Sequence, residues 1–274
     1  MNVLLLGGHG KIALRLIPLL LARSWSVTAV IRNPEHKPDI LSLANNHPGK
    51  LSVLLSSLDE VRSDADAKRI LDAANPDYVV WAAGAGGKGG PARTQAIDSD
   101  AAKHILAASF ASARVSKILL ISWIGSRRAQ PSWMSDADWA RIQDVFHRVL
   151  PAYAQAKLEA DEYMTALAAR RAKDVAAGKA KPLQAINLRP GTLTDEEATR
   201  KVDLGRTSRG YGTVSREDVA IVADLLLARG DTEGWVDLLA GEEDVEGAVE
   251  RVARGGVDAV EGEDVEGMVR RFGL

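Results

Sequence analysis

The chain has no cysteine among its 274 residues, which excludes disulfide bonds, thiolate catalysis and cysteine-ligated metal. Its formal net charge of −2 gives no electrostatic case for a nucleic-acid partner or an anionic membrane. No apolar run is long enough to span a bilayer, so we expect no membrane association. The five histidines show no spacing typical of a metal site, and we therefore expect no bound metal.

We also expect no cleavable secretory signal. Residues 1–22 are largely apolar, but Lys11 and Arg15 interrupt the run and no clear small-residue cleavage site follows. Together with the lack of cysteine, this pattern indicates a cytoplasmic or nuclear protein, and we take cytoplasmic as the expectation. The oligomeric state is left open.

The strongest pattern that is present lies in the first 35 residues. An apolar run at 2–6 is followed by Gly-Gly-His-Gly-Lys-Ile-Ala at 7–13, an amphipathic stretch and a second apolar run ending at Ile31. This order predicts strand, glycine turn, helix and strand. The turn fits the G-x-G-x-x-G/A pattern, in which backbone N–H groups and a helix N-terminus hold a pyrophosphate.

The end of the second predicted strand indicates which nucleotide is bound. NAD usually requires an acid there for its ribose 2′-hydroxyl, whereas an arginine accommodates the 2′-phosphate of NADP. This chain has Arg32 at that position and no acid until Glu35. Because a guanidinium makes forked contacts with phosphate, the sequence favours NADP as the cofactor.

Further along, short apolar runs alternate with helical patterns. The runs at 51–55, 78–82, 118–122 and 183–188 predict buried strands, and 59–74, 91–113 and 152–177 predict helices. This alternation predicts an α/β fold with a doubly wound parallel sheet. We divide the chain into a nucleotide-binding domain at 1–190, which includes an aromatic-rich insertion at 123–150, and a C-terminal region at 191–274 packed on the same domain.

Two segments follow strand ends, where ligands bind in such sheets. The glycine-rich stretch 84–90 is expected to let backbone approach the cofactor. The stretch 123–150 carries three of the six tryptophans and fits either core packing or an apolar substrate pocket. Within it, Ser135-x-x-Asp138 is a helix-capping pattern.

The C-terminal region begins with a polar stretch, 191–213, which we expect to form a mobile loop over the site, with Tyr211 able to reach substrate. A helix capped by Ser215 should run to about Arg229 and be followed by a strand at 235–239. Two Asp-Val-Glu-Gly copies, at 244–247 and 264–267, predict short helix starts at the edge of the domain.

A Tyr-x-x-x-Lys pair, Tyr153 and Lys157, lies on the predicted helix 152–177, where i, i+4 spacing puts both side chains on one face. With it, the chain resembles the short-chain dehydrogenase/reductases, specifically their atypical branch with NmrA-like and biliverdin-reductase-B-like proteins. The resemblance covers about residues 2–240. The matching segments are 7–13, 32–34, 83–88, 121–122, Tyr153 with Lys157, 188–191 and 215–220.

This resemblance implies a Rossmann-type fold and a role for each matched position. Tyr153 would donate a proton to a carbonyl oxygen, Lys157 would hold the ribose and favour the phenolate, and Ser122 would orient the substrate. Since Ser122 precedes Tyr153 by 31 residues, the intervening segment must fold back for the three to meet. The implied cofactor contacts are Gly7, Gly10, Lys11 and Ile12 for pyrophosphate, Arg32 for the 2′-phosphate, Ser57 and Leu58 for adenine, Ala82, Ala83 and Gly84 beside the nicotinamide, and Pro190, Gly191 and Thr192 on its far side.

Three functions remain open from the sequence. The first is an NADP(H)-dependent oxidoreductase that reduces a small, partly apolar carbonyl or enone compound. The second is a non-catalytic NADP(H)-binding redox sensor or regulator. The third is an epimerase or dehydratase that uses a bound nucleotide transiently; acidic or basic residues beside Ser122 and Tyr153 would favour it, and none is adjacent in sequence.

Overall fold

The structure, a computed structural model, describes residues 1–86 and 89–274. Its strands are β1 (Asn2–Leu6), β2 (Ser26–Ile31), β3 (Lys50–Leu55), β4 (Tyr78–Trp81), β5 (Lys117–Ile121), β6 (Gln184–Pro190), β7 (Thr192–Thr194), β8 (Lys201–Gly205), β9 (Thr213–Ser215), β10 (Gly234–Ala240) and β11 (Glu243–Asp244). Its α-helices are α1 (Lys11–Ala22), α2 (Lys37–Ser42), α3 (Asp64–Ala74), α4 (Gly90–Thr94), α5 (Ala102–Ala111), α6 (Asp136–Asp144), α7 (Pro151–Ala176), α8 (Arg216–Ala228), α9 (Val245–Arg254) and α10 (Val265–Arg271). Short 3-10 turns cover Pro34–His36 and Leu58–Glu60, and π-helical segments cover Gln95–Ala101 and Val145–Val149.

Across the described residues, nine strands form one sheet in the order β11-β8-β10-β6-β5-β4-β1-β2-β3, while β7 and β9 pair separately. The strands from β3 to β10 are parallel, and β8 and β11 are antiparallel at one edge. The order 3-2-1-4-5-6 is that of a Rossmann sheet. The predicted doubly wound α/β fold is therefore confirmed, with an antiparallel edge added.

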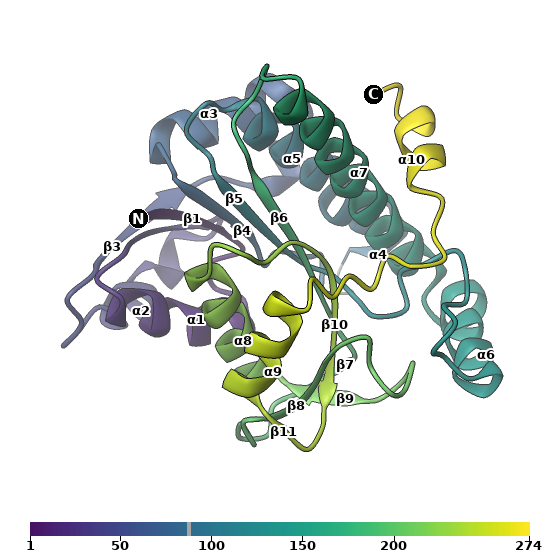
Figure 1. Cartoon of the computed structure of the whole chain (residues 1–274). Coiled ribbons are helices and arrows are strands. Elements are labelled where there is room, and N and C mark those ends of the chain that lie inside the picture. The colour runs from purple at the N-terminus through teal and green to yellow at the C-terminus, as the bar shows by residue number, and fades with distance from the viewer. Residues whose placement is uncertain (87–88) are drawn as a thin grey trace.

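Two helical layers cover the two faces of the sheet (Figure 1). On one face α1, α8 and α9 pack over apolar side chains from β1, β6 and β10. On the other face α3, α5 and α7 pack over the alternate residues of β1, β4 and β5. Since side chains alternate along a strand, both faces of the central strands are apolar, which explains their uninterrupted Val, Ile and Leu content.

The predicted strands agree with the observed ones to within about two residues, and several helix boundaries have a local cause. Ser135 and Ser215 accept hydrogen bonds from the N–H groups of Asp138 and Asp218, as the capping patterns predicted. The helix expected at 59–74 starts later, at Asp64, because Ser63 caps it there. Both Asp-Val-Glu-Gly copies begin helices, α9 and α10.

The segment 191–213 differs from the prediction. Instead of one mobile loop, it contains β7 and β8 and ends at the start of β9. In β8, Val202 and Leu204 are buried while Lys201 is exposed, and the strand pairs antiparallel with β10. A five-residue alternation is too short to stand out in a polar segment, because its pairing partner lies about 35 residues away.

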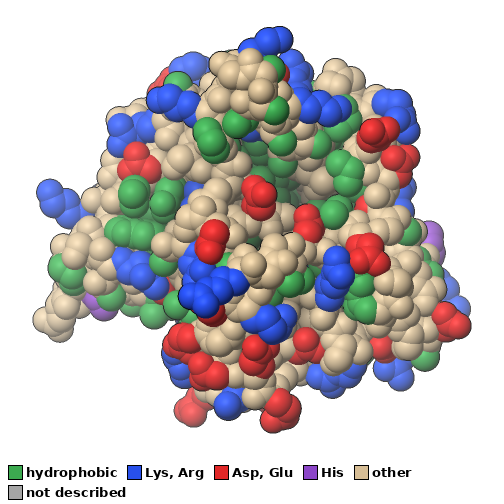
Figure 2. All heavy atoms as spheres, viewed as in Figure 1, with side chains coloured by type: hydrophobic (Ala, Val, Ile, Leu, Met, Phe, Trp, Pro, Cys, Tyr) green, Lys and Arg blue, Asp and Glu red, His purple; other side chains and the backbone are tan. Residues whose placement is uncertain are grey.

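Charged side chains of both signs are mixed over the face seen in Figure 2, with no broad area of one sign. This distribution agrees with the near-zero net charge. Of the helices within residues 1–86 and 89–274, none has the length and apolarity required to cross a bilayer.

Candidate functional site

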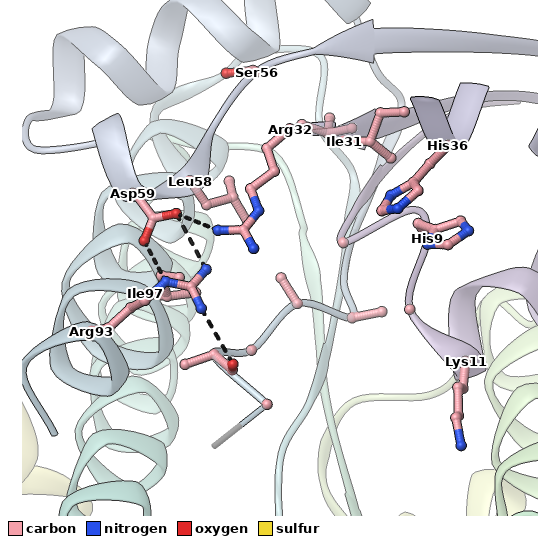
Figure 3. A pocket seen from close by; sticks show the side chains of 18 residues that line it. His9, Lys11, Ile31, Arg32, His36, Ser56, Leu58, Asp59, Arg93 and Ile97 are labelled. Carbon is pink, nitrogen blue, oxygen red and sulfur yellow. Dashed lines mark hydrogen bonds and ion pairs between the residues drawn. The ribbon is translucent and has the colours of Figure 1, made fainter. Parts of the chain in front are cut away.

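A cavity of about 470 Å³ opens at the carboxyl ends of β1, β2 and β4 (Figure 3). In a doubly wound sheet, this edge is where ligands bind. Its lining combines the glycine turn, the end of β2, the turn after β3 and the loop after β4. The lining residues are Gly7, His9, Gly10, Lys11, Val30, Ile31, Arg32, His36, Ser56, Leu58, Asp59, Ala82, Ala83, Gly84, Ala85, Gly86, Arg93 and Ile97.

The glycine turn has the geometry of a phosphate cradle. Gly7 has φ +81°, and a Cβ there would lie 2.7 Å from the Ala83 Cα, so the turn packs directly on the loop after β4. Gly10 precedes α1 and gives it no side-chain cap. The first amides of a helix have no intrahelical partner, and they carry its positive dipole end. This arrangement fits a dinucleotide pyrophosphate.

Of the next two residues, Lys11 lines the cavity, whereas Ile12 lies outside its lining. The Ile12 side chain is buried in the core under α1. The Lys11 ammonium forms an ion pair with Asp195, which also pairs with Arg216 at 2.9 Å. The segment after β7 is therefore tied to the first turn of α1 beside the cavity.

Replacing Gly7 by alanine is expected to abolish nucleotide binding and to lower the free energy of unfolding by more than about 1 kcal/mol. The added Cβ would meet Ala83 and would sit at a positive φ. Gly178→Ala is the matched control, because Gly178 also has a positive φ but a Cβ there meets nothing within 4 Å. Calorimetric nucleotide titration and urea unfolding measure both effects, and unchanged binding by Gly7→Ala would contradict the cradle.

Arg32 lines the cavity at the end of β2, and its guanidinium already has a partner. Its Nη1 lies 3.2 Å from Asp59 Oδ2, and Arg93 Nε lies 2.8 Å from Asp59 Oδ1. Leu58 also lines the cavity, whereas Ser57 is outside its lining and has its hydroxyl 3.4 Å from Asp59.

Among the titratable residues that line the cavity, the sequence interpretation missed Asp59, Arg93, His9 and His36. The two histidine rings are stacked with centroids 3.7 Å apart, and His9 Nε2 lies 3.5 Å from Asp39 (Figure 3). His9 lies inside the glycine motif and was a visible candidate. The others come from two turns and a helix whose approach to the cavity depends on the tertiary fold.

The loop after β4 is connected to α7 through Asp98, which the sequence interpretation also missed. The Asp98 carboxylate accepts a hydrogen bond from the Ala85 N–H at 2.8 Å and lies 3.3 Å from Lys157 Nζ. A Cβ on Gly84 would lie 2.9 Å from the same carboxylate, so a larger residue would displace the carboxylate from this position. Gly87 and Lys88 of this loop lie outside the described residues.

Lys157 is buried at the end of β5. Its Nζ donates a hydrogen bond to the Ile121 carbonyl at 3.3 Å, next to Ser122, and lies 5.8 Å from the Tyr153 ring centre. Burial disfavours the ammonium, but Asp98 and Tyr153 outweigh it and raise the Lys157 pKa. The chain between Ser122 and Tyr153 therefore does fold back and returns α7 to the strand end.

Tyr153 lies between Lys157 and Trp123, whose ring centre is 6.1 Å from that of the phenol. Burial raises the pKa of Tyr153, and the neighbouring ammonium opposes the shift. The phenol is therefore protonated at neutral pH. Ser122, Tyr153 and Lys157 are outside the lining of the 470 Å³ cavity, and Asp98 links Lys157 to Ala85 in that lining.

The residues after β6 lie beside the end of β5. The Pro190 carbonyl accepts a hydrogen bond from Ile124 N–H at 3.0 Å. The N–H groups of Gly191 and Thr192 donate to Leu238 and Gly212, both at 2.9 Å. In the sheet, β5 and β4 separate the end of β6 from the glycine turn after β1, and these three residues do not line the cavity either.

The aromatic residues of 123–150 and the nearby Tyr211 have different surroundings. Trp123 lies beside Tyr153, whereas Trp133 packs against Arg127 and Arg206 at 5.7 Å and 5.2 Å. Tyr211 is exposed over Arg141 of α6. Of these residues, Trp123 is the one whose ring lies beside that of Tyr153.

A further acid, Asp161, lies about one helical turn after Lys157 on α7. It is fully buried, and its carboxylate accepts a hydrogen bond from Ser126. Burial raises its pKa to about 6, against the opposing effects of Arg189, Ser122 and Ser126. No acid is adjacent to Ser122 in sequence, but the fold supplies this one.

Asp161 is expected to make stability fall as pH rises from about 4 to about 6. The folded protein holds this proton up to about pH 6, whereas the unfolded carboxyl releases it near 3.8. The contribution is on the order of 2–3 kcal/mol. Urea unfolding of Asp161→Asn across this pH range should show a smaller decrease in the free energy of unfolding with pH than the wild-type protein shows. An unchanged pH dependence would contradict the assignment.

Comparison with known proteins gives consistent results. A family model described as NAD(P)H-binding matches residues 7–229. A UPF0659 protein of Schizosaccharomyces pombe is 32% identical over 217 residues, which cover 78% of this chain and 79% of that protein. A solved structure of a putative NAD-dependent epimerase/dehydratase from Bacillus halodurans superposes with a TM-score of 0.70 at 25% identity, covering 92% of this chain and 99% of that one.

A reductase shares the fold at lower identity. The anaerobillin reductase ChuY from Escherichia coli has a TM-score of 0.60 at 20% identity, covering 89% of this chain and 99% of its own. With the family match over most of the chain, the glycine cradle and the Rossmann strand order, these similarities are consistent. The chain belongs to the NAD(P)H-binding Rossmann proteins of the atypical short-chain dehydrogenase/reductase and epimerase-like family.

Proposed function

We infer that the chain is an NADP(H)-dependent oxidoreductase that reduces a small, partly apolar carbonyl or enone compound, with Tyr153 as the proton donor. One observation carries this proposal: Lys157 joins the end of β5, the Tyr153 ring and, through Asp98, the backbone of the loop beside the nucleotide cavity. A phenol and an ammonium at the boundary between cofactor and substrate are the groups that carbonyl reduction requires.

Each side chain has a defined task in this reaction. When bound, the nicotinamide supplies the hydride. Tyr153, protonated because burial raises its pKa, gives its proton to the substrate oxygen. The Lys157 ammonium then stabilises the resulting phenolate, and Ser122 orients the oxygen by hydrogen bonding. Trp123, beside Tyr153, supplies apolar surface for the substrate.

The NADP part of the proposal rests on Arg32, which lines the adenosine end of the cavity. An arginine at the end of β2 is the position from which a 2′-phosphate is held. We also propose a cytoplasmic location, a small-molecule substrate without a nucleic-acid or membrane partner, and the division into a nucleotide-binding part at 1–190 and a substrate-side part at 191–274.

A spectroscopic titration tests the proposal. Purified protein is titrated with NADPH and NADH and then assayed with aldehydes, quinones and enones. Tighter binding of NADPH with turnover of one of these classes is the expected result. Binding without turnover across the panel, unchanged by Tyr153→Phe, would instead support the redox-sensor function, and tighter NADH binding would contradict the use of Arg32.

Asp161 favours a second candidate, an epimerase or dehydratase that reduces and reoxidises its own bound nucleotide. A buried carboxyl with a pKa of about 6 near Ser122 is suited to moving a proton to or from a substrate carbon. Such an enzyme would convert substrate with no net consumption of NADPH. Solvent deuterium incorporation into a recovered sugar or alcohol, without net change in absorbance at the NADPH band, distinguishes it from the reductase.

A further inference from the structure

Two arginines from different elements meet at one carboxylate at the adenosine end of the cavity (Figure 3). Arg32 follows β2, Arg93 lies in α4, and Asp59 lies in the turn after β3. Arg93 makes a bidentate, fork-like contact with Asp59, with Nε 2.8 Å from Oδ1 and Nη2 3.2 Å from Oδ2. Arg32 Nη1 donates to the same Oδ2 at 3.2 Å.

We propose that Asp59 sets the preference between NADP and NAD, because its carboxylate already binds the Arg32 guanidinium. A 2′-phosphate that binds Arg32 must therefore share this guanidinium with the carboxylate. This inference rests on the proposed nucleotide-binding function. It makes Asp59 a specificity-determining residue and Arg93 the residue that positions it.

The position of Asp59 is fixed more firmly than that of Arg32. The Asp59 side chain is 34% exposed and the Arg93 side chain 22%, whereas Arg32 is 58% exposed. Arg93 adds a contact of 3.5 Å to the Ala85 carbonyl in the loop after β4. A carboxylate held by such a fork cannot easily swing away when a ligand arrives, because its departure would break both charge-assisted hydrogen bonds from Arg93.

The charges determine the consequence for binding. Arg32, Arg93 and Asp59 together carry a net charge of +1, and the Arg93 hydrogen bond chiefly lowers the Asp59 pKa, so the carboxylate is ionised at neutral pH. A 2′-phosphate brings nearly two negative charges to Arg32 beside this carboxylate. Like-charge repulsion cancels part of the gain from Arg32, whereas a free 2′-hydroxyl meets no such repulsion. The preference for NADP is therefore weaker than Arg32 alone implies.

The test compares ligands that contain only the adenosine half of the cofactor. Adenosine 2′,5′-bisphosphate and 5′-AMP are titrated calorimetrically into the full chain, and the ratio of their affinities measures the 2′-phosphate contribution. In Asp59→Asn we expect this ratio to rise about 5- to 20-fold over wild type. Asp72→Asn removes the same charge from an exposed pair with Lys68 on α3 and should leave the ratio within about 2-fold.

Two more variants keep the result interpretable. Asp59→Ser removes the charge with a smaller side chain and should raise the ratio in the same direction if Asp59→Asn folds poorly. Arg32→Gln, combined with Asp59→Asn, should remove the increase, since the freed guanidinium is its source. A ratio that stays within 2-fold of wild type in the Asp59 variants, or that falls, would overturn the inference.

The failure of this inference can be told apart from failure of the proposed function. If wild-type protein binds neither NADPH nor NADH, nucleotide binding itself is wrong and this inference falls with it. If wild type binds NADPH and the Asp59 variants show no increase in the ratio, only the role of Asp59 is overturned.

Discussion

Replacing Asp237 by alanine is expected to lower the free energy of unfolding by about 3–5 kcal/mol. Asp237 lies in β10 between Arg127 Nη2 at 3.1 Å and Arg189 Nε at 2.9 Å, and all three side chains are completely buried. Removing the carboxylate leaves two buried guanidinium groups without their counter-charge. Arg189 also stacks on Trp235 with 3.8 Å between guanidinium carbon and ring centre, so it has no route to solvent.

Urea unfolding at pH 7 measures this loss. Asp72→Ala breaks an exposed ion pair with Lys68 and serves as the control, with an expected loss below about 1 kcal/mol. A loss of similar size in both variants would contradict the assigned importance of the buried cluster. The effect also concerns the site, because Arg189 directly precedes Pro190, and Arg127 follows β5 by six residues.

Replacing Tyr153 by phenylalanine is expected to lower kcat about 100- to 10,000-fold if the chain reduces carbonyl compounds as proposed. The phenol is the proton source beside Lys157, and the variant keeps the ring that packs near Trp123. Since Tyr153 does not line the nucleotide cavity, the Kd for NADPH should change by less than about 2-fold. Steady-state kinetics and NADPH fluorescence titration give the two quantities separately.

Tyr163→Phe is the matched control for this experiment. Tyr163 lies on the same helix, α7, but its ring packs against Phe272 of the C-terminal segment. The control should retain wild-type kcat and Kd. Turnover by Tyr153→Phe at the wild-type rate would exclude the phenol as the proton donor. The buried carboxyl of Asp161 would then be the candidate donor.

Local signals determined most of the nucleotide-binding half. The glycine turn, the start of α1 and the strands β1 to β6 follow from apolar periodicity and from glycine positions that need no partner elsewhere in the chain. The serine caps of α6 and α8 are also local, because cap and donor are only three residues apart. Arg32 lines the cavity because it directly follows a strand whose end is fixed by the fold, and its contact with a 2′-phosphate stays a prediction.

The tertiary structure alone decided which charges meet at the site. Asp59 and Arg93 are 34 residues apart, and Asp98 and Lys157 are 59 apart, so neither pair has a sequence signature. Strand β8 and the burial of Asp161 likewise depend on partners supplied by other elements. The sequence by itself determined where the glycine turn lies, because that turn is built from consecutive residues. Which side chains surround the cavity beside it depends on long-range packing, and only the folded chain brings them together.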